Sequence, residues 1–174
     1  MSSPDDILYY FSGSADKAPG SGVNEYVGDV SAYHELASIP SWRRILSNFY
    51  EDEFVYEGFR YRSVEHAFQG QKIAMADGQK AYEFTMDSGS RLGLGTGLDA
   101  RKARKMVVLS HEDIATWDKI KMIVMKEILY ARFSTSALGR RVLLATGNAQ
   151  LWHGARGIPK ERQVWLEDVR DMVR

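Results

Sequence analysis

The 174-residue chain contains no cysteine. This absence excludes thiolate nucleophiles, disulfide frameworks and zinc sites built on sulfur. The chain also lacks an apolar run of the about 18 residues that a membrane-spanning helix needs. It has no surplus of one charge either, because 23 lysines and arginines face 23 aspartates and glutamates. Without a net field to attract nucleic acid, any polyanion must be bound by local groups.

The residues that are present, 44% hydrophobic and 26% charged, are typical of a folded domain. A core of this size needs no metal or disulfide to hold it, and we predict one domain over residues 1–174. Ser2–Asp6 show neither the basic start nor the apolar stretch of a signal peptide, so we expect a cytoplasmic location. Basic residues concentrate in the middle of the chain, where Arg91–Arg141 hold eleven bases and five acids.

The expected elements are mainly helical. An aromatic alternation around Glu57-Gly58 predicts a β-hairpin at 54–61, and Ser63 is placed to cap the helix that follows. Residues 12–45 form a loop-rich extension, whose first part is dense in Gly, Ser, Asp and Pro. We further predict strands at Ile7–Phe11 and Gln150–His153 and helices over Val64 to about Phe84, around Ala100–Lys105, and over His111–Phe133, Ala137–Thr146 and Gln163–Val173.

One polar stripe on the helix after the hairpin could carry chemistry. At about 100° per residue, Glu65, Gln69 and Lys72 fall on one narrow strip beside an apolar face. Partial burial at such a border raises the pKa of a carboxyl group and lowers that of an amine, which suits acid, base or nucleophilic roles. A solvated helix face with ordinary side chains explains the same spacing. Spacing alone leaves both interpretations open.

Two loops are further candidates. The glycine-dense loop Gly89–Gly97 could hold a phosphate through backbone amides, but it lacks the Lys and Ser/Thr of a P-loop. The segment Trp152–Gly157 combines an aromatic ring, an imidazole and a guanidinium, which could stack on a base and hold a phosphate, or could be an exposed turn. Neither pattern decides between a functional and a structural role.

Asp118 and the histidines have routine explanations. An acid at the start of the long helix would favour the helix dipole, which accounts for Asp118 without any function. His34, His66 and His111 show no metal-ligand spacing with one another or with acids. We therefore expect no metal, and nothing in the sequence calls for a cofactor.

Five ordered segments resemble one known family. They are Leu-Ser-Asn-Phe-Tyr at 46–50, the aromatic hairpin, Ser-Val-Glu-His-Ala-Phe-Gln-Gly-Gln-Lys at 63–72, Thr-Trp-Asp-Lys at 116–119 with Val124-Met125, and Leu-Ala-Thr-Gly-Asn-Ala at 144–149. In this order they resemble the NADAR family, named for its association with NAD and ADP-ribose, over residues 46–151. The resemblance implies a compact α+β, mainly helical fold with a small β-hairpin and sheet, and an N-glycosidase that cleaves a ribose–nitrogen bond.

The resemblance also implies roles for individual residues. Glu65 would be the catalytic carboxylate, and Lys72 would capture the anomeric carbon as a Schiff base, or would only hold phosphate or hydroxyl groups. The implied substrate contacts are Asn48, Phe49, Gln69, Trp117 and Asp118. Arg101 and Lys102, with Arg104 and Lys105, would contact phosphates, although a solvated basic face explains them equally well. Residues 151–165 depart from the family pattern, so Trp152 and Arg156 are expected to form a different wall of the pocket.

The resemblance implies two classes of substrate, of which the first is our prediction and the second is the alternative. The first is guanine ADP-ribosylated in DNA, RNA or a nucleotide, with a cognate ADP-ribosyltransferase toxin as a possible partner. The second is a phosphorylated intermediate of riboflavin biosynthesis. A non-catalytic ADP-ribose-binding module and a plain nucleic-acid-binding domain are further alternatives, the latter disfavoured by the balanced charge. No membrane partner is expected.

Overall fold

The computed structural model describes residues 1–174, which divide into two units. The first unit comprises Met1–Ser47 and Ala137–Arg174, and the second comprises Asn48–Ser136. The first holds β1 (Ile7–Tyr10), η1 (Val30–Tyr33), α1 (His34–Ser38), α2 (Trp42–Ile45), α7 (Ala137–Ala145), β4 (Gln150–His153), β5 (Glu161–Arg162) and α8 (Val164–Val173). The second holds β2 (Phe54–Tyr56), β3 (Phe59–Tyr61), α3 (Val64–Ile73), α4 (Gly78–Tyr82), η2 (Met86–Ser88), α5 (Gly97–Lys102), η3 (Ala103–Met106) and α6 (His111–Thr135).

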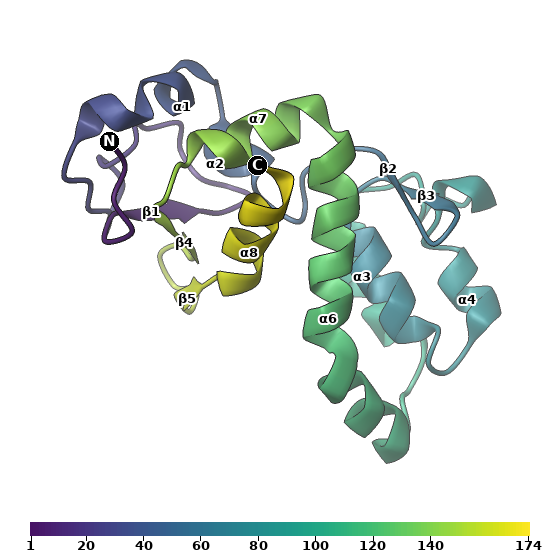
Figure 1. Cartoon of the computed structure of the whole chain (residues 1–174). Helices are drawn as coiled ribbons and strands as arrows, with labels where there is room; N and C mark the ends of the chain where they lie inside the picture. The colour runs from purple at the N-terminus through teal and green to yellow at the C-terminus, as the bar shows by residue number, and fades with distance from the viewer. The chain divides into compact units, whose positions relative to one another are not determined.

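The first unit is built on a three-stranded sheet of order β1-β4-β5. β4 pairs parallel to β1, with Leu8 opposite Leu151, and antiparallel to β5. Both leucines are fully buried, which places the core of this unit on that face of the sheet. Helix α8 packs on β4 and on α7, and α7 is also in contact with α1 and α2 (Figure 1).

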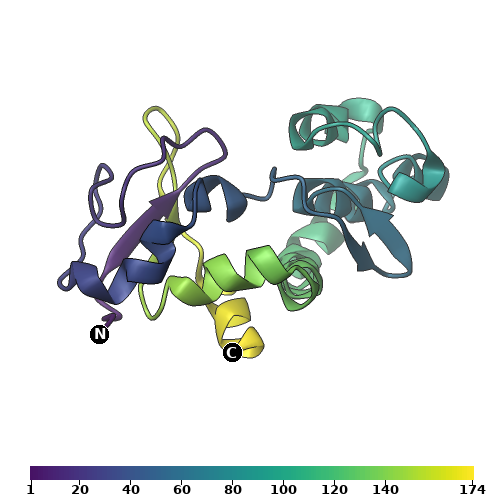
Figure 2. The ribbon, with the colours of Figure 1, turned by 90° about the horizontal axis from the view of Figure 1, so that it is seen from above.

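The second unit is built on the pair of helices α3 and α6, which pack against each other (Figures 1 and 2). The β2-β3 hairpin turns through Glu57 and Gly58, both at positive φ, as a type I′ turn requires. α6 also packs on β2, and the hydroxyl of Tyr56 donates to Glu127 at 2.8 Å. On α6, the fully buried Arg132 donates to Asp52 at 3.0 Å. These contacts hold the hairpin and α3 on the long helix.

Most predicted elements are confirmed, as is the α+β, mainly helical class. The helix predicted from Val64 to Phe84 is wrong as one element, because Asp77 accepts from the backbone N–H groups of Gln79 and Lys80 and so caps a new helix. The extension 12–45 holds η1, α1 and α2, each too short to show a helical period in the sequence. One domain over 1–174 stays a prediction. None of the helices combines the length and apolar character needed to cross a membrane.

Candidate functional site

Glu65 lies in the first turn of α3, where two local contacts fix the backbone. Ser63 caps the helix by accepting from the N–H of His66 at 3.2 Å, as predicted. The N–H of Glu65, one of the donors that a helix start leaves free, donates to the carbonyl of Asn48 at 3.0 Å. The Ser-Asn-Phe segment therefore lies directly against the turn that carries Glu65.

The carboxylate of Glu65 is buried, with 8% of the residue exposed. Gln69, one helical turn further on, donates from Nε2 to Oε1 of Glu65 at 2.9 Å. Burial raises the pKa of Glu65, whereas the bond from Gln69 and the positive charges of Arg101, Arg104 and Lys72 lower it. Burial prevails, so the pKa stays above its ordinary value. A carboxyl group in this state can serve as an acid as well as a base.

Gln69 offers an acceptor that nothing in the fold uses. Its Oε1 atom is buried and has no hydrogen-bond partner. Leaving such an atom unpaired costs about 1–3 kcal/mol, and a ligand that brings an N–H or O–H donor removes this cost. The orphaned oxygen therefore suits a hydroxyl or amine placed beside the Glu65 carboxylate.

Lys72 lies two turns after Glu65 and on the same face of α3, as the periodicity predicts. The residue is half-buried, and its amine has neither a hydrogen bond nor an ion pair. An amine that is not engaged within the fold can approach a ligand. The structure thus presents a carboxyl group and an amine along one strip of helix.

The aromatic pair behind this strip joins α3 to α6. The ring of Phe68 lies 5.1 Å from the ring of Trp117, which is 4% exposed. Trp117 therefore backs α3 from the core of the unit. Asp118, the next residue, is exposed and pairs with Lys121 at 3.0 Å. The helix-dipole explanation for Asp118 is wrong, because α6 begins seven residues earlier at His111, where Ser110 and Asp113 form a capping box.

The glycine-dense loop is explained by packing. His66 is fully buried, and its Nε2 donates to the carbonyl of Leu92 at 2.9 Å while Nδ1 lies 2.7 Å from the hydroxyl of Ser63. Burial lowers the pKa of His66, which keeps the neutral ring that both bonds need. At Gly93 a Cβ would lie 2.0 Å from the carbonyl oxygen of Thr85. These contacts account for the loop without a phosphate.

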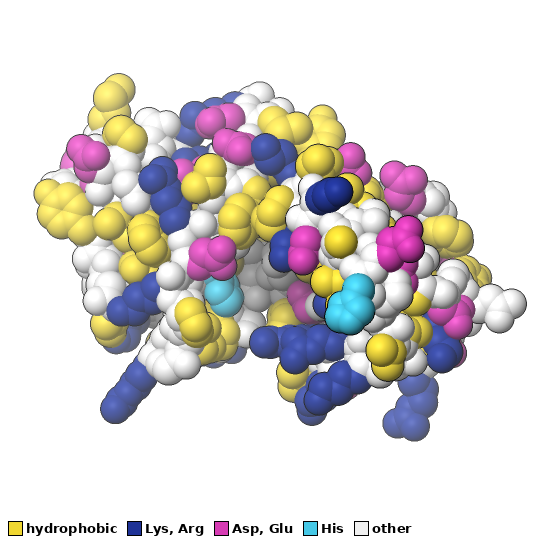
Figure 3. Space-filling model, turned by 90° about the horizontal axis from the view of Figure 1, so that it is seen from below, with side chains coloured by type: hydrophobic (Ala, Val, Ile, Leu, Met, Phe, Trp, Pro, Cys, Tyr) yellow, Lys and Arg dark blue, Asp and Glu magenta, His cyan; other side chains and the backbone are white.

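The basic residues lie at the end of α5 and in η3. Arg101, Lys102, Arg104 and Lys105 are all exposed. Helix α5 packs on α3, and both Arg101 and Arg104 are near enough to Glu65 to lower its pKa. Lysine and arginine side chains project freely from the surface seen in Figure 3. The end of α5 thus adds positive charge to the region of Glu65 and Lys72.

Replacing Gly97 with alanine is expected to destabilise the second unit by about 1–3 kcal/mol. A Cβ at Gly97 would lie 2.8 Å from the Cα of Phe49, so α5 would be pushed away from the Ser-Asn-Phe segment. Gly78→Ala is the matched control, because nothing lies within 4 Å of its Cβ, and it should stabilise by up to ~1 kcal/mol. Urea unfolding of both variants checks this. Equal effects would contradict the close packing at Gly97.

Trp152 and Arg156 belong to the first unit. On β4, the Trp152 ring lies 6.0 Å from the Tyr9 ring, and its Nε1 donates to Gln150 at 3.0 Å. Arg156 is exposed and lines a cavity of about 640 Å³ within this unit.

In the second unit, the structure brings Asn48, Glu65 and Gln69 into contact and places Lys72 and Arg101 near them.

Sequence reasoning missed four lining residues of that cavity, Tyr9, Lys17, Arg43 and Lys160. They are spread over four segments, and no spacing in the sequence links them. Arg43 is buried, but nothing in the sequence distinguishes it from an exposed arginine of a short helix.

No group of three or more His, Asp or Glu side chains in residues 1–174 is arranged to hold a metal ion.

Comparisons with known proteins show the family and the fold of this chain. A family model described as the NADAR domain matches residues 39–156. The NMR structure of the E. coli protein YbiA is similar to this chain with a TM-score of 0.57 and 18% identity, over 97% of this chain and 85% of that one. At this identity the similarity shows a shared fold. A search of curated proteins found no match. Because the family model matches more than half of its residues, the chain belongs to the NADAR family.

Proposed function

We propose that this protein is an N-glycosidase that hydrolyses the ribose–nitrogen bond of ADP-ribosylated guanine, in nucleic acid or nucleotides, and releases ADP-ribose. One observation carries the proposal: the buried carboxyl group of Glu65, with its raised pKa, shares a helix face with the unengaged amine of Lys72. The NADAR family is generally glycosidase-like. A carboxyl group and an amine at this spacing suit cleavage of a glycosidic bond to nitrogen.

Glu65 acts first as an acid. It gives a proton to the ring oxygen of the ribose, and the ring opens as the guanine nitrogen forms a double bond to the anomeric carbon. The raised pKa of Glu65 keeps more of the acid form present near neutral pH than a free carboxyl group would have. The bond from Gln69 holds the carboxyl group in place on α3.

Lys72 then takes the place of the leaving amine. Its nitrogen adds to the anomeric carbon, the bond from that carbon to guanine breaks, and the guanine amine leaves with a proton. Water, activated by the Glu65 carboxylate, adds to the resulting Schiff base and frees ADP-ribose and Lys72. In the rival mechanism, Glu65 alone activates water against an oxocarbenium-like state, and Lys72 only holds the substrate.

Substrate binding uses groups around this strip. The Ser-Asn-Phe segment supports ribose and base contacts by Asn48 and Phe49, because Asn48 touches the turn that carries Glu65. The orphaned Oε1 of Gln69 accepts from a ribose hydroxyl or from the exocyclic nitrogen. Exposed Arg101 and Lys102 pair with the diphosphate. Trp117 supports the site from behind, and Asp118 is a rim contact.

A comparison of two substrates tests the proposed reaction. The full chain is incubated with an oligonucleotide carrying ADP-ribosylated guanine and, separately, with a phosphorylated ribosylaminopyrimidine of riboflavin biosynthesis. We expect ADP-ribose and intact guanine from the first and little product from the second, as followed by chromatography. Rapid cleavage of only the second would show that the substrate is the riboflavin intermediate, while the proposed cleavage of a ribose–nitrogen bond would stand. Saturable ADP-ribose binding without any product would make the protein a binding module instead.

A further inference from the structure

The cavity of the first unit is a built feature outside the site just described. It is formed by the strand residue Tyr9, by the loop at residues 14–24, by Arg43 of α2 and by the loop at residues 154–160. Its volume of about 640 Å³ lies within the range of small-molecule sites, about 300–1,000 Å³. It is therefore larger than a single phosphate or metal ion requires.

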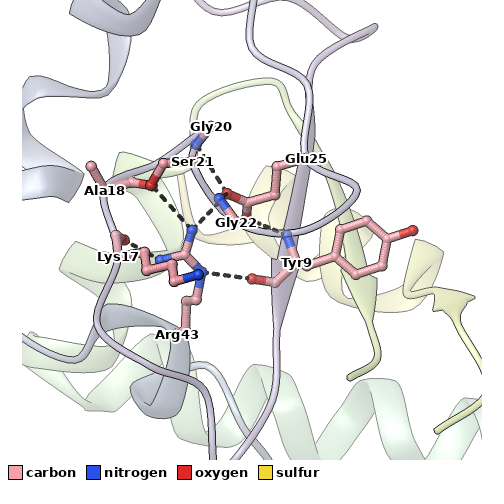
Figure 4. Close-up of polar contacts among 8 residues, drawn as sticks. All are labelled: Tyr9, Lys17, Ala18, Gly20, Ser21, Gly22, Glu25 and Arg43. Carbon is pink, nitrogen blue, oxygen red and sulfur yellow. Dashed lines mark hydrogen bonds and ion pairs between the residues drawn. The ribbon is translucent and has the colours of Figure 1, made fainter. Parts of the chain in front are cut away.

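A buried ion pair holds one wall of this cavity in place (Figure 4). The Arg43 guanidinium pairs with Glu25 at 2.6 Å and donates to the carbonyls of Tyr9, Lys17 and Ala18. The Glu25 carboxylate in turn accepts from the N–H groups of Tyr9, Gly20 and Gly22, at 2.8 to 3.0 Å. The side chains are 5% and 0% exposed. The loop is thus tied to β1 and α2 before any ligand arrives.

The charge around the cavity has one sign. Its lining contains no aspartate or glutamate, and it contains four cationic residues. Arg43 is neutralised by Glu25, but Lys17, Arg156 and Lys160 are exposed and have no ion-pair partner. Three unpaired cations at the edge of one cavity favour an anion with more than one negative charge.

The walls of the cavity are mainly apolar. Val23, Ile158 and Pro159 contribute aliphatic surface, and the aromatic residue Tyr9 also lines the cavity. Of the lining glycines, Gly157 has nothing within 4 Å of the position that a Cβ would take, so a ligand can approach its backbone closely. A flat ring fits between such walls, and phosphates fit the cations at the edge.

We propose that this cavity binds a nucleoside phosphate, with the ring held against Tyr9, Ile158 and Pro159 and the phosphates held by Lys17, Arg156 and Lys160. The site does not depend on the proposed glycosidase activity, because every lining residue belongs to the first unit. A nucleoside phosphate can also bind here without containing the ribose–nitrogen bond that the enzyme would cleave. The Arg43–Glu25 pair acts as a positioning contact that keeps the loop wall in place.

Calorimetry on the full chain with ADP tests this site. Adenosine supplies the ring without phosphate, and pyrophosphate supplies phosphate without the ring; both should bind more weakly than ADP. The variant Lys17→Gln/Lys160→Gln should weaken ADP binding by about tenfold or more, since each loss removes a charged contact. Lys80→Gln/Lys119→Gln removes two exposed lysines of the second unit and should leave the affinity unchanged.

Crosslinking locates the bound ligand. Photolysis of 8-azido-ADP on the chain, followed by peptide mass mapping, should label residues 9–24 or 154–160. Labels confined to residues 48–136, equal loss of affinity in both double variants, or no measurable ADP binding would each overturn the proposal. Failure here leaves the glycosidase proposal standing, because the substrate comparison measures release of product and not binding of ADP.

Discussion

Replacing Glu65 with glutamine is expected to lower turnover of ADP-ribosylated guanine by about 10²–10⁴-fold, the range of general acid–base catalysis. Glutamine keeps the size and the contact with Gln69 but cannot give or take a proton at this position. Initial rates under substrate saturation measure the loss. Glu51→Gln, an exposed carboxylate of the same unit, is the control and should keep its rate. Undiminished turnover in Glu65→Gln would remove Glu65 from the mechanism.

The same variant should fold, and it should be more stable than the parent near neutral pH. A carboxyl group whose pKa is raised in the folded state binds its proton more tightly there than in the unfolded chain. Stability therefore falls as pH rises from the unfolded pKa through the folded pKa. Glutamine does not titrate, so the advantage should be absent below about pH 4 and present at about pH 7. Urea unfolding at both values checks this, and an equal difference at both would contradict the role of burial.

Replacing Arg43 with leucine is expected to cost about 3–5 kcal/mol of stability, as for other buried pairs that lose one partner. The change leaves the Glu25 carboxylate buried without its cation and frees carbonyls of Tyr9, Lys17 and Ala18. The loop wall of the first-unit cavity should become mobile as a result.

Arg44→Leu is the matched control for this variant. Arg44 is the next residue on α2, but it is exposed and makes one bond, to the carbonyl of Ser14 at 2.9 Å. Its loss should cost about 1 kcal/mol or less. Denaturant unfolding measures both, and hydrogen exchange over residues 12–28 reports the loop. A similar cost for the two variants would show that the Arg43–Glu25 pair does not hold this segment.

Local features were predictable where neighbouring residues decide the structure. The hairpin follows from the aromatic alternation around Glu57-Gly58, because a two-residue turn with positive φ angles matches the twist of paired strands. The strip of Glu65, Gln69 and Lys72 follows from the helical period alone. The break at Asp77 could have been predicted from the capping preference of aspartate, but the residues on both sides of it favour a helix.

Features that depend on contacts distant in sequence were not predictable. The burial that raises the pKa of Glu65 comes from packing by several elements, and its contact with Asn48 joins segments on either side of the hairpin. The Arg43–Glu25 pair lies outside the segments that resemble the family, and only the fold shows that it is buried. The need for glycine in the loop at 89–97 is likewise visible only from the atoms that a Cβ at these positions would contact.

The most direct measurement is release of ADP-ribose from guanine-modified DNA in the presence and absence of borohydride, with the protein mass followed in parallel. Borohydride reduces a Schiff base to a stable amine, so we expect released ADP-ribose in its absence and a mass adduct on Lys72 in its presence. Release without an adduct would favour direct hydrolysis through Glu65. Neither release nor adduct from folded protein would contradict the proposed function.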